Sequence, residues 1–533
     1  MPSFTYRTAV VAPVLLLAIV QLAAAQRESP TSVFERNTAP IQLYETGLGT
    51  FTRPISSSST DAQAFFDQGV RLMYAFGKSE AVRSFREAWK RDPECAICYW
   101  GEAWAWGSYL NGPMTAEEAP HAYAAIQKAL GLRNRASGVE QAFIDAMAVR
   151  YVEDFDPARR AEQDRAYADA MRRVSETYPD DLDAATLYAD ALFLLEPRRG
   201  TRDVNDPDVR RLHRVLEGIL AKDVHHPGAC HLYVHATEST VVPERAEACA
   251  EFLGASMPAA SHINHMPSHT WNRVGRWGDS VRANLEAWHS DLKAAAGEGV
   301  AIYPDHNLHM LLYAASYDGQ GAIAMRAGKD YAKRTGSSFY EALTLLRFGR
   351  FDEILAIAER PQHPVQAGLW DFAQGYAHLR QDAPDFARVY LARVTKAADT
   401  STATYRRHPA KALLGAVAGI LEGELHREDG KLEEAIRAFE RAVASEDALD
   451  YDEPEPLPFT ARHWLGAALI EAKRFEDAAR AYREDLKEHP MNGWSLFGLR
   501  QALAALGTPS TEVDADFERS WARSDTWIRG SRF

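Results

Sequence analysis

Two five-residue stretches of this chain carry histidine in the same pattern. The first is His231-Leu-Tyr-Val-His235 and the second is His265-Met-Pro-Ser-His269. Within each stretch, the four-residue spacing puts both imidazoles on one face of a helix, where they can bind one metal ion. The two stretches start 34 residues apart, a period that is typical of repeats built from two helices. The pattern therefore predicts a stacked helical array in which equivalent positions of neighbouring repeats lie side by side.

From about residue 61 the chain is rich in Ala, Leu, Arg and Glu, and Gly and Pro separate the segments in which these residues predominate. This pattern predicts helices joined by turns. The clearest unit combines small, large and aromatic residues at Trp464, Leu465, Gly466, Leu469, Ala478, Tyr482 and Pro490. The same spacing recurs at Gly69, Leu72, Ala81, Phe85, Ala88 and Pro93. It recurs again at Gly423, Ala435, Phe439 and Ala442, and more loosely at Gly375 and Ala387.

These units resemble the tetratricopeptide repeat (TPR) signature, and the chain is similar to a secreted, bacterial-type member of that family with a histidine-rich central region. The resemblance covers most of residues 61–510. It implies an all-α fold, a solenoid of helical hairpins that forms a right-handed superhelix. In that family the concave groove binds ligands, and most members are scaffolds.

We divide the chain into six segments on composition and repeat pattern. They are a signal peptide over 1–25, a low-order leader over 26–60, N-terminal TPR-like hairpins over 61–225, histidine-rich units over 226–330, C-terminal TPR units over 331–510, and a tail over 511–533. Two irregular stretches interrupt the units. Residues 294–303 are an insertion that we expect to form a lid or edge of the site, and the acidic residues 446–458 are an expected loop.

The N-terminus has a positive start at Arg7, an apolar run over 9–20 and an Ala-rich cleavage region that ends at Ala25. This pattern predicts a secretory signal peptide, and the apolar run is too short to cross a bilayer comfortably. We therefore expect a secreted or periplasmic protein with no membrane span. The net charge of -14 argues against nucleic-acid binding, which needs a basic face.

Repeat register places the histidines on a common surface. Aligned on Gly275 and the small residues of the second helices, His231 and His265 share position 5 of the first helix, and His235 and His269 share position 9. Position 2 is taken by His262. These positions cluster on the helix side that lines the groove in the family. A third unit, offset by the insertion, contributes equivalent positions at His306, His309 and Tyr313.

More than half of the 18 histidines lie between residues 225 and 309. Imidazole nitrogens suit copper, zinc, iron and nickel. We favour copper, with zinc or iron as alternatives, and the number of histidines allows two ions. The predicted ligands are His231, His235, His262, His265, His269, His306 and His309. Without a metal, the same residues would form a histidine-lined peptide groove or a pH-sensitive surface.

Other residues are assigned to the same groove. We expect Glu238 to be an acid/base group or an extra ligand, and Tyr313 to supply a phenol near the metal. Trp100 and Trp104 occupy positions 5 and 9 of their own unit, where they would form either an aromatic wall for a substrate or buried packing.

The four cysteines are an even number, which favours disulfides in an oxidising compartment. The Cys95-Ala-Ile-Cys98 pair fits a structural bridge better than a redox-active one. Cys230 and Cys249 occupy opposite positions of two antiparallel helices, so that we expect a bridge there too.

Two functions follow from these patterns. The first is a metal-dependent oxidoreductase, an oxidase or oxygenase that acts on a small molecule or peptide in the groove. The second is a non-enzymatic scaffold that binds a protein or peptide partner. The histidine register favours the enzyme, and the family resemblance favours the scaffold.

Overall fold

The computed structural model describes residues 32–196 and 200–532, so that the signal peptide expected over 1–25 lies outside the described residues. Almost all regular structure within them is helical, and consecutive helices pack as antiparallel pairs. The predicted all-α solenoid of helical hairpins is confirmed. No helix in the described ranges combines the length and hydropathy that crossing a membrane requires.

The N-terminal helices are α1 (Val33–Thr38), α2 (Thr60–Tyr74), α3 (Lys78–Arg91), α4 (Ala96–Trp106), α5 (Ala119–Gly131), α6 (Gly138–Ala148), α7 (Arg160–Thr177), α8 (Leu182–Phe193) and α9 (Pro207–Leu220). The central helices are α10 (Pro227–Thr237), α11 (Glu247–Ser256), α12 (Ser261–His265), α13 (Pro267–Arg273), α14 (Trp277–Ala295), α15 (Pro304–Tyr317) and α16 (Gly321–Thr335).

The C-terminal helices are α17 (Phe339–Arg347), α18 (Phe351–Leu355), α19 (Pro364–Arg380), α20 (Pro384–Thr400), α21 (Ala410–Glu428), α22 (Leu432–Asp447), α23 (Arg462–Glu471), α24 (Phe475–Glu488), α25 (Gly493–Ala505) and α26 (Thr511–Trp521). Short 3-10 turns lie at Arg133–Arg135, Pro157–Arg159 and Pro243–Ala246. A small antiparallel hairpin of β1 (Thr404–Tyr405) and β2 (His408–Pro409) joins α20 to α21.

Small residues allow the two helices of a hairpin to approach closely. A Cβ atom added to Gly69 would lie 2.6 Å from the ring of Phe85 on the partner helix. Gly423 and Gly466 meet the rings of Phe439 and Tyr482 in the same way. In each contact, the small residue recognised in the sequence lies on one helix and the aromatic residue lies on its partner. The repeat pattern therefore reflects how the two helices of a hairpin pack together.

Seven of the short turns between paired helices share one backbone form. One helix ends, the second residue after it adopts a left-handed conformation, and the next helix begins two residues later. The left-handed residues of these turns are Phe76, Gly275, Gly319, Gly349, Asp382, Gly430 and Lys473. Glycine predominates because a side chain is strained in this conformation.

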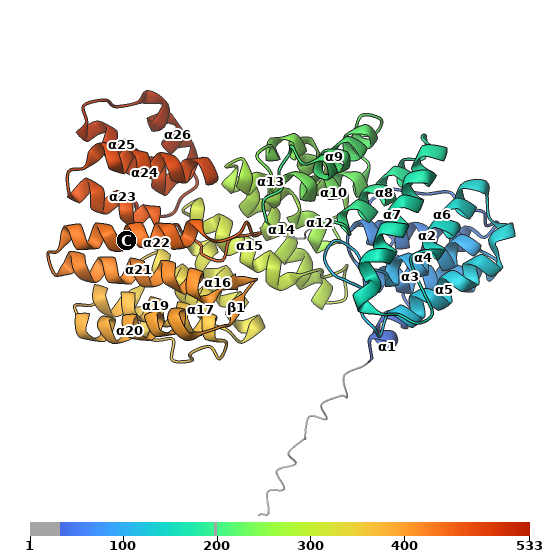
Figure 1. Ribbon diagram of the computed structural model, residues 1–533, viewed down its shortest axis with the longest axis horizontal. Coiled ribbons are helices and arrows are strands. Elements are labelled where there is room, and N and C mark those ends of the chain that lie inside the picture. Colours follow the sequence, from blue (N-terminus) through green and yellow to red (C-terminus); the bar gives the residue numbers. More distant parts are fainter. Residues whose placement is uncertain (1–31, 197–199, 533) are drawn as a thin grey trace, which may run out of the picture.

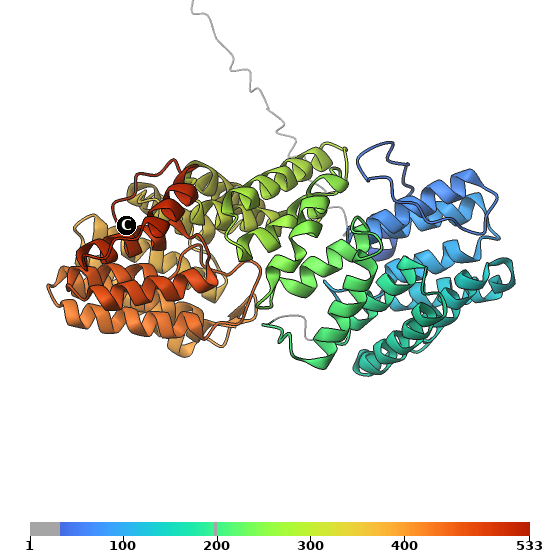
Figure 2. The ribbon, with the colours of Figure 1, turned by 90° about the horizontal axis from the view of Figure 1, so that it is seen from above.

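The chain curves so that its C-terminal hairpins return to the central helices (Figures 1 and 2). Trp494 on α25 donates a hydrogen bond from Nε1 to the carbonyl of Ser316 on α15, at 2.9 Å. The residues after α26 reach the turn between α15 and α16, where Asp525 Oδ1 accepts from the backbone N–H of Gly321 at 2.7 Å. The segment predicted as a tail therefore consists of α26 and an extended stretch that contacts the central helices.

The low-order leader predicted over 26–60 is wrong for its described part. Residues 32–59 contain α1 and an extended strap that crosses the N-terminal and central helices. Leu48 is only 2% exposed, and the carbonyl of Gly47 accepts from the N–H of Ala259 at 2.8 Å. Arg53 forms ion pairs with Asp181 and Asp183. Burial and ion pairing order a segment whose polar composition resembles that of a linker.

The hydrophobic core consists of two clusters that meet in the centre of the chain. One extends from Ile41 to Ile302, and the other extends from Trp277 to Leu503. The histidine-bearing helices α12 and α15 lie where these clusters adjoin (Figure 1, green). A buried polar cluster is thus held between two apolar ones.

Candidate metal centre

The structure gathers six of the seven predicted histidine ligands into one buried cluster. They form two sets of three, and within each set the ligand nitrogens lie within 4.8 Å of one another. The first set is His231, His235 and His262, and the second set is His265, His269 and His306. The convergence that the repeat register predicted is therefore present, whereas metal binding itself stays a prediction.

The second histidine pair lies on two short helices instead of one. Pro267 begins α13 and has no N–H to continue the hydrogen bonding of α12. The chain nevertheless keeps a helical path, because the N–H of Met266 bonds the carbonyl of His262 at 3.0 Å. His265 and His269 consequently remain on one face, with their Nε2 atoms 2.7 Å apart.

The Nε2 nitrogens point toward one another in both sets. His265 Nε2 lies 3.1 Å from His306 Nε2, in addition to its contact with His269. In the first set, Nε2 of His231 lies 3.2 Å from Nε2 of His262. A neutral imidazole carries a lone pair on its unprotonated nitrogen. Converging lone pairs are stabilised only by a proton or a cation between them.

The opposite nitrogens are fixed by hydrogen-bond acceptors. His231 Nδ1 lies 2.6 Å from the carbonyl of Tyr74, and His265 Nδ1 lies 2.9 Å from Oδ1 of Asn284. A carbonyl oxygen can only accept a hydrogen bond. Nδ1 of His231 and of His265 therefore carries the proton, and Nε2 of each carries a lone pair. Metal-bound histidines are oriented in this manner.

Glu238 connects the two sets. Its Oε1 accepts from Nδ1 of His235 at 2.8 Å, and its Oε2 makes a short hydrogen bond with Nδ1 of His269. The carboxylate therefore lies behind one histidine of each set, on the Nδ1 side. This placement favours an orienting group over the acid/base role or direct ligand that the sequence suggested.

Glu453 also reaches the cluster, from the predicted loop over 446–458. Its Oε2 lies 3.1 Å from Nδ1 of His269, and Tyr451 of the same loop donates to Glu238 Oε2 at 3.4 Å. Arg406 in the β1–β2 turn donates from Nη2 to the carbonyl of Glu453 at 2.6 Å and pairs with Asp452. Sequence reasoning missed these residues, because neither the irregular acidic loop nor the β1–β2 turn has a periodicity from which a neighbour could be inferred.

Burial makes most of the cluster neutral. It lowers the pKa of His231, His262, His265 and His306 well below the ordinary value, and neighbouring histidines lower these pKa values further. At His269, burial also acts to lower the pKa, but the carboxylates of Glu238 and Glu453 outweigh it and raise this pKa to about 10. Without a metal, His269 therefore holds a proton that a bound cation would displace.

A cavity of about 200 Å³ opens onto both sets. Every lining side chain is polar or aromatic: Asn111, His235, His262, His269, Tyr303, His306, Arg406 and Glu453. Tyr303 ends the insertion over 294–303, and its phenol makes a short hydrogen bond with that of Tyr109. The insertion therefore supplies an edge of the site. The volume and lining suit a small polar molecule.

His309 and Tyr313 occupy other surroundings. Nδ1 of His309 lies 3.3 Å from Nη1 of Arg406, and its ring packs at a tilt against that of Tyr340 with centroids 4.3 Å apart, outside both sets. His309 lies almost one helical turn beyond His306 on α15, and this displacement along the helix places its ring beside Arg406 and Tyr340. Tyr313 packs against Tyr317 at 4.8 Å and reaches His269 only across a separate small cavity.

Trp100 and Trp104 do not line the 200 Å³ cavity. Trp100 packs on Phe143 at 5.4 Å in the N-terminal core. Trp104 stacks edge-on to Tyr74 at 5.8 Å and borders a narrow apolar cavity that also contacts His231. The structure thus supports the packing interpretation of both tryptophans.

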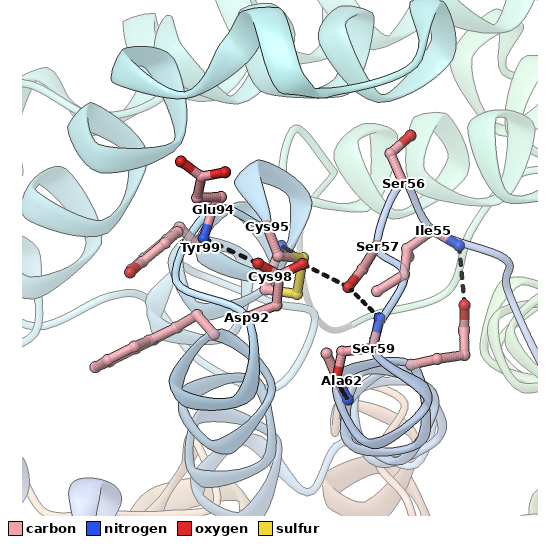
Figure 3. Close-up of a disulfide and its surroundings, with 12 residues drawn as sticks. Ile55, Ser56, Ser57, Ser59, Ala62, Asp92, Glu94, Cys95, Cys98 and Tyr99 are labelled. Carbon is pink, nitrogen blue, oxygen red and sulfur yellow. Dashed lines mark hydrogen bonds between the residues drawn. A yellow bond between two sulfur atoms is a disulfide. The ribbon is translucent and has the colours of Figure 1, made fainter.

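Both expected cysteine pairs are bridged. Cys230 and Cys249, whose Cα atoms lie 4.8 Å apart, join α10 to α11 directly beside His231. Cys95 and Cys98 bridge the start of α4 beside Asp92 and Ser57 (Figure 3). They are 1% and 0% exposed, which keeps other thiols away and fits a structural bridge.

Comparison with known proteins finds no matching family profile and no matching curated protein. Three solved structures illustrate the similarities found. Human IFIT1 with m7Gppp-AAAA is 11% identical, covers 80% of this chain and 90% of its own, and has a TM-score of 0.32. The APC/C hetero-tetramer Cut9–Hcn1 is 13% identical, covers 86% and 76%, and scores 0.30. The P58(IPK) TPR domain is 10% identical, covers 84% and 99%, and scores 0.21.

Proposed function

We propose that the protein binds two transition-metal ions, one in each histidine set, and is an exported metal-dependent oxidase or oxygenase. Copper is favoured over zinc or iron. The substrate is a small molecule or peptide that reaches the polar cavity. The observation that carries this proposal is the pair of adjoining three-histidine sets, in which Nε2 atoms converge while Nδ1 meets an acceptor in four of the histidines: His231, His235, His265 and His269.

The composition of the sets supports copper. Each set consists only of imidazoles, and the nearby carboxylates lie on the Nδ1 sides of His235 and His269. Nitrogen ligands suit copper, zinc and iron, whereas magnesium, calcium and manganese prefer oxygen. The two disulfides fit an exported protein, and an oxidising compartment favours copper over ferrous iron.

Bound copper would supply one-electron chemistry with dioxygen. The protein side chains hold the ligands and handle protons. Glu238 orients His235 and His269. Glu453 borders the cavity, where its carboxylate can accept a proton from a substrate hydroxyl or amine. Arg406 holds the Glu453 backbone in place through its hydrogen bond to the carbonyl.

The test begins with metal content. The exported protein is purified without a histidine tag, reconstituted with copper, zinc or iron, and analysed for bound metal. Two ions per chain are expected, with copper held most tightly. A protein without stoichiometric metal would contradict the proposal. Oxygen uptake by the copper form with small phenols, amines and thiols then tests for catalysis.

A second candidate is a non-enzymatic scaffold. A cavity of about 420 Å³ lies outside the Glu453 loop, where segments around Thr240, Tyr451 and Lys487 meet. Val241 on its wall is 73% exposed, which suits contact with a side chain of a partner. Metal binding without any substrate-dependent oxygen uptake, together with a saturable peptide affinity that a Val241→Asp substitution abolishes, would favour this function.

A further inference from the structure

A third group of ligand atoms lies where the two histidine sets meet. One nitrogen from each of His235 and His269 and one carboxylate oxygen from each of Glu238 and Glu453 lie within 4.8 Å of one another. The nitrogens that contact the carboxylates are Nδ1. We call these four residues the mixed group. It offers two nitrogens and two oxygens, whereas each histidine set offers nitrogens alone.

The hydrogen bonds around His269 leave an acceptor in excess. Oε2 of Glu238 makes a short contact with Nδ1 of His269, and Oε2 of Glu453 lies 3.1 Å from the same nitrogen. One imidazole nitrogen carries a single hydrogen, which can point in a straight line at only one of the two oxygens. Two carboxylates that meet at a buried nitrogen require positive charge between them. A divalent cation in the mixed group would serve both carboxylates at once.

Charge balance distinguishes the mixed group from the histidine sets. Two carboxylates and two neutral imidazoles carry two negative charges, which one divalent ion neutralises. Pairing of this kind matters because His235, Glu238 and His269 are buried, and an unpaired buried charge is costly. Zinc and iron suit imidazole ligands, as copper does, whereas manganese prefers oxygen. Manganese(II) is therefore the ion for which the carboxylates of the mixed group make the greatest difference.

Two histidines are shared between the mixed group and the sets. His235 belongs to the first set and His269 to the second. A neutral imidazole has one lone pair, which is on Nε2 when Nδ1 carries the hydrogen and on Nδ1 when Nε2 carries it. An ion that binds Nδ1 of both residues therefore takes one ligand from each set.

We propose that the mixed group is a separate site for one manganese(II) ion, and that this site and the two copper positions are not occupied together. The exclusion rests on the proposed binding of two copper ions, whereas the manganese site rests on the mixed group alone. Copper binds sites of nitrogen and oxygen ligands more tightly than manganese does. Copper therefore displaces the manganese, and the protein holds either one manganese ion or two copper ions.

The test is a manganese titration of the full exported protein, followed by electron paramagnetic resonance, in which free aqueous manganese(II) gives a signal that declines on binding. The wild type is expected to bind one manganese ion and to release it when copper is added. In the manganese site Glu453 is a ligand. Glu453→Gln should therefore lower the manganese affinity by more than the roughly 100-fold that loss of an orienting residue costs at most.

His262→Ala is the matched counterpart, because His262 belongs to the first set and lies outside the mixed group. This variant should lose one copper ion and keep the manganese affinity of the wild type. Glu455→Gln is the control for the loop, since Glu455 contacts His489 at 3.1 Å. It should keep the affinities for both metals.

The possible outcomes separate this inference from the two-copper proposal. A wild type that holds two copper ions but never binds manganese, or a manganese affinity that Glu453→Gln leaves intact, overturns the manganese site alone. Loss of manganese in His262→Ala does the same, because it places that ion in a histidine set. Manganese bound together with two copper ions overturns the exclusion. A protein that binds manganese but no copper overturns the two-copper proposal, and one that binds neither overturns both.

Discussion

Oε2 of Glu453 lies 3.1 Å from Nδ1 of His269, although the two residues are far apart in the sequence. The contact joins the loop between α22 and α23 to the central histidine helices. It exists because the chain curves until its C-terminal hairpins meet its middle (Figures 1 and 2). The candidate centre is thus completed by two regions that repeat register alone does not bring together.

Replacing Glu453 tests this relationship. Glu453→Gln removes the charge that supports the Nδ1 proton of His269, and loss of such a partner typically costs about 10- to 100-fold in metal affinity. We expect that loss for one of the two ions, measured by competition titration. Glu455→Gln is the control, since Glu455 contacts His489 at 3.1 Å instead. Equal effects of the two substitutions would show that Glu453 has no particular role.

Glu238→Gln is expected to lower the affinity of the protein for both metal ions. The carboxylate bonds His235 of the first set and His269 of the second set, so that its loss releases one ligand in each. An effect on only one ion in the same titration would argue against this connection. Glu102→Gln removes another buried carboxylate, bonded to Arg86 and Trp89, and should leave both affinities unchanged.

Substitutions of two histidines in neighbouring units distinguish a predicted ligand from a histidine outside both sets. His265→Ala removes the nitrogen that lies closest to both His269 and His306, and we expect one ion to be lost by elemental analysis. His309→Ala should retain two ions, because His309 lies beside Tyr340 and Arg406, outside both sets. Loss of metal in the His309 variant would show that the ligands of the two histidine sets are assigned incorrectly.

The disulfides should differ in their effect on the centre. Cys230 and Cys249 close a loop with a sequence separation of 19 and hold the helix that carries His231. Replacing both with Ser should lower the free energy of unfolding by about 3 kcal/mol and weaken metal binding. The double Ser variant of Cys95 and Cys98, whose separation is 3, should keep its metal affinity. Thermal unfolding and metal titration of both variants measure the difference.

Asp190 should make stability depend on pH. Burial raises the pKa of Asp190 to about 6, against a lowering influence from Arg150 and from a hydrogen bond with Trp104. The folded protein therefore holds this proton at pH values where the unfolded chain has released it, so that stability falls as pH rises from about 4 to 6. Asp190→Asn lacks this loss. Relative to wild type it should gain on the order of 3 kcal/mol across that interval, measured by urea unfolding.

Several features could be predicted from the sequence because they are local and periodic. The contact between Gly69 and Phe85 follows from paired-helix packing, and the convergence of His235 with His269 follows from equivalent positions in stacked repeats. The order of residues 32–59 could not be predicted. It depends on burial of Leu48 and on the pairing of Arg53 with distant aspartates.

The sequence by itself determined which histidines share a helix face, because helical periodicity and the 34-residue repeat are properties of the chain alone. Only the tertiary structure decided what surrounds them. Phe76, Arg406 and Glu453 reach the two sets from other turns and loops, through the curvature of the whole array. Curvature accumulates from small rotations between successive hairpins, which no single motif specifies.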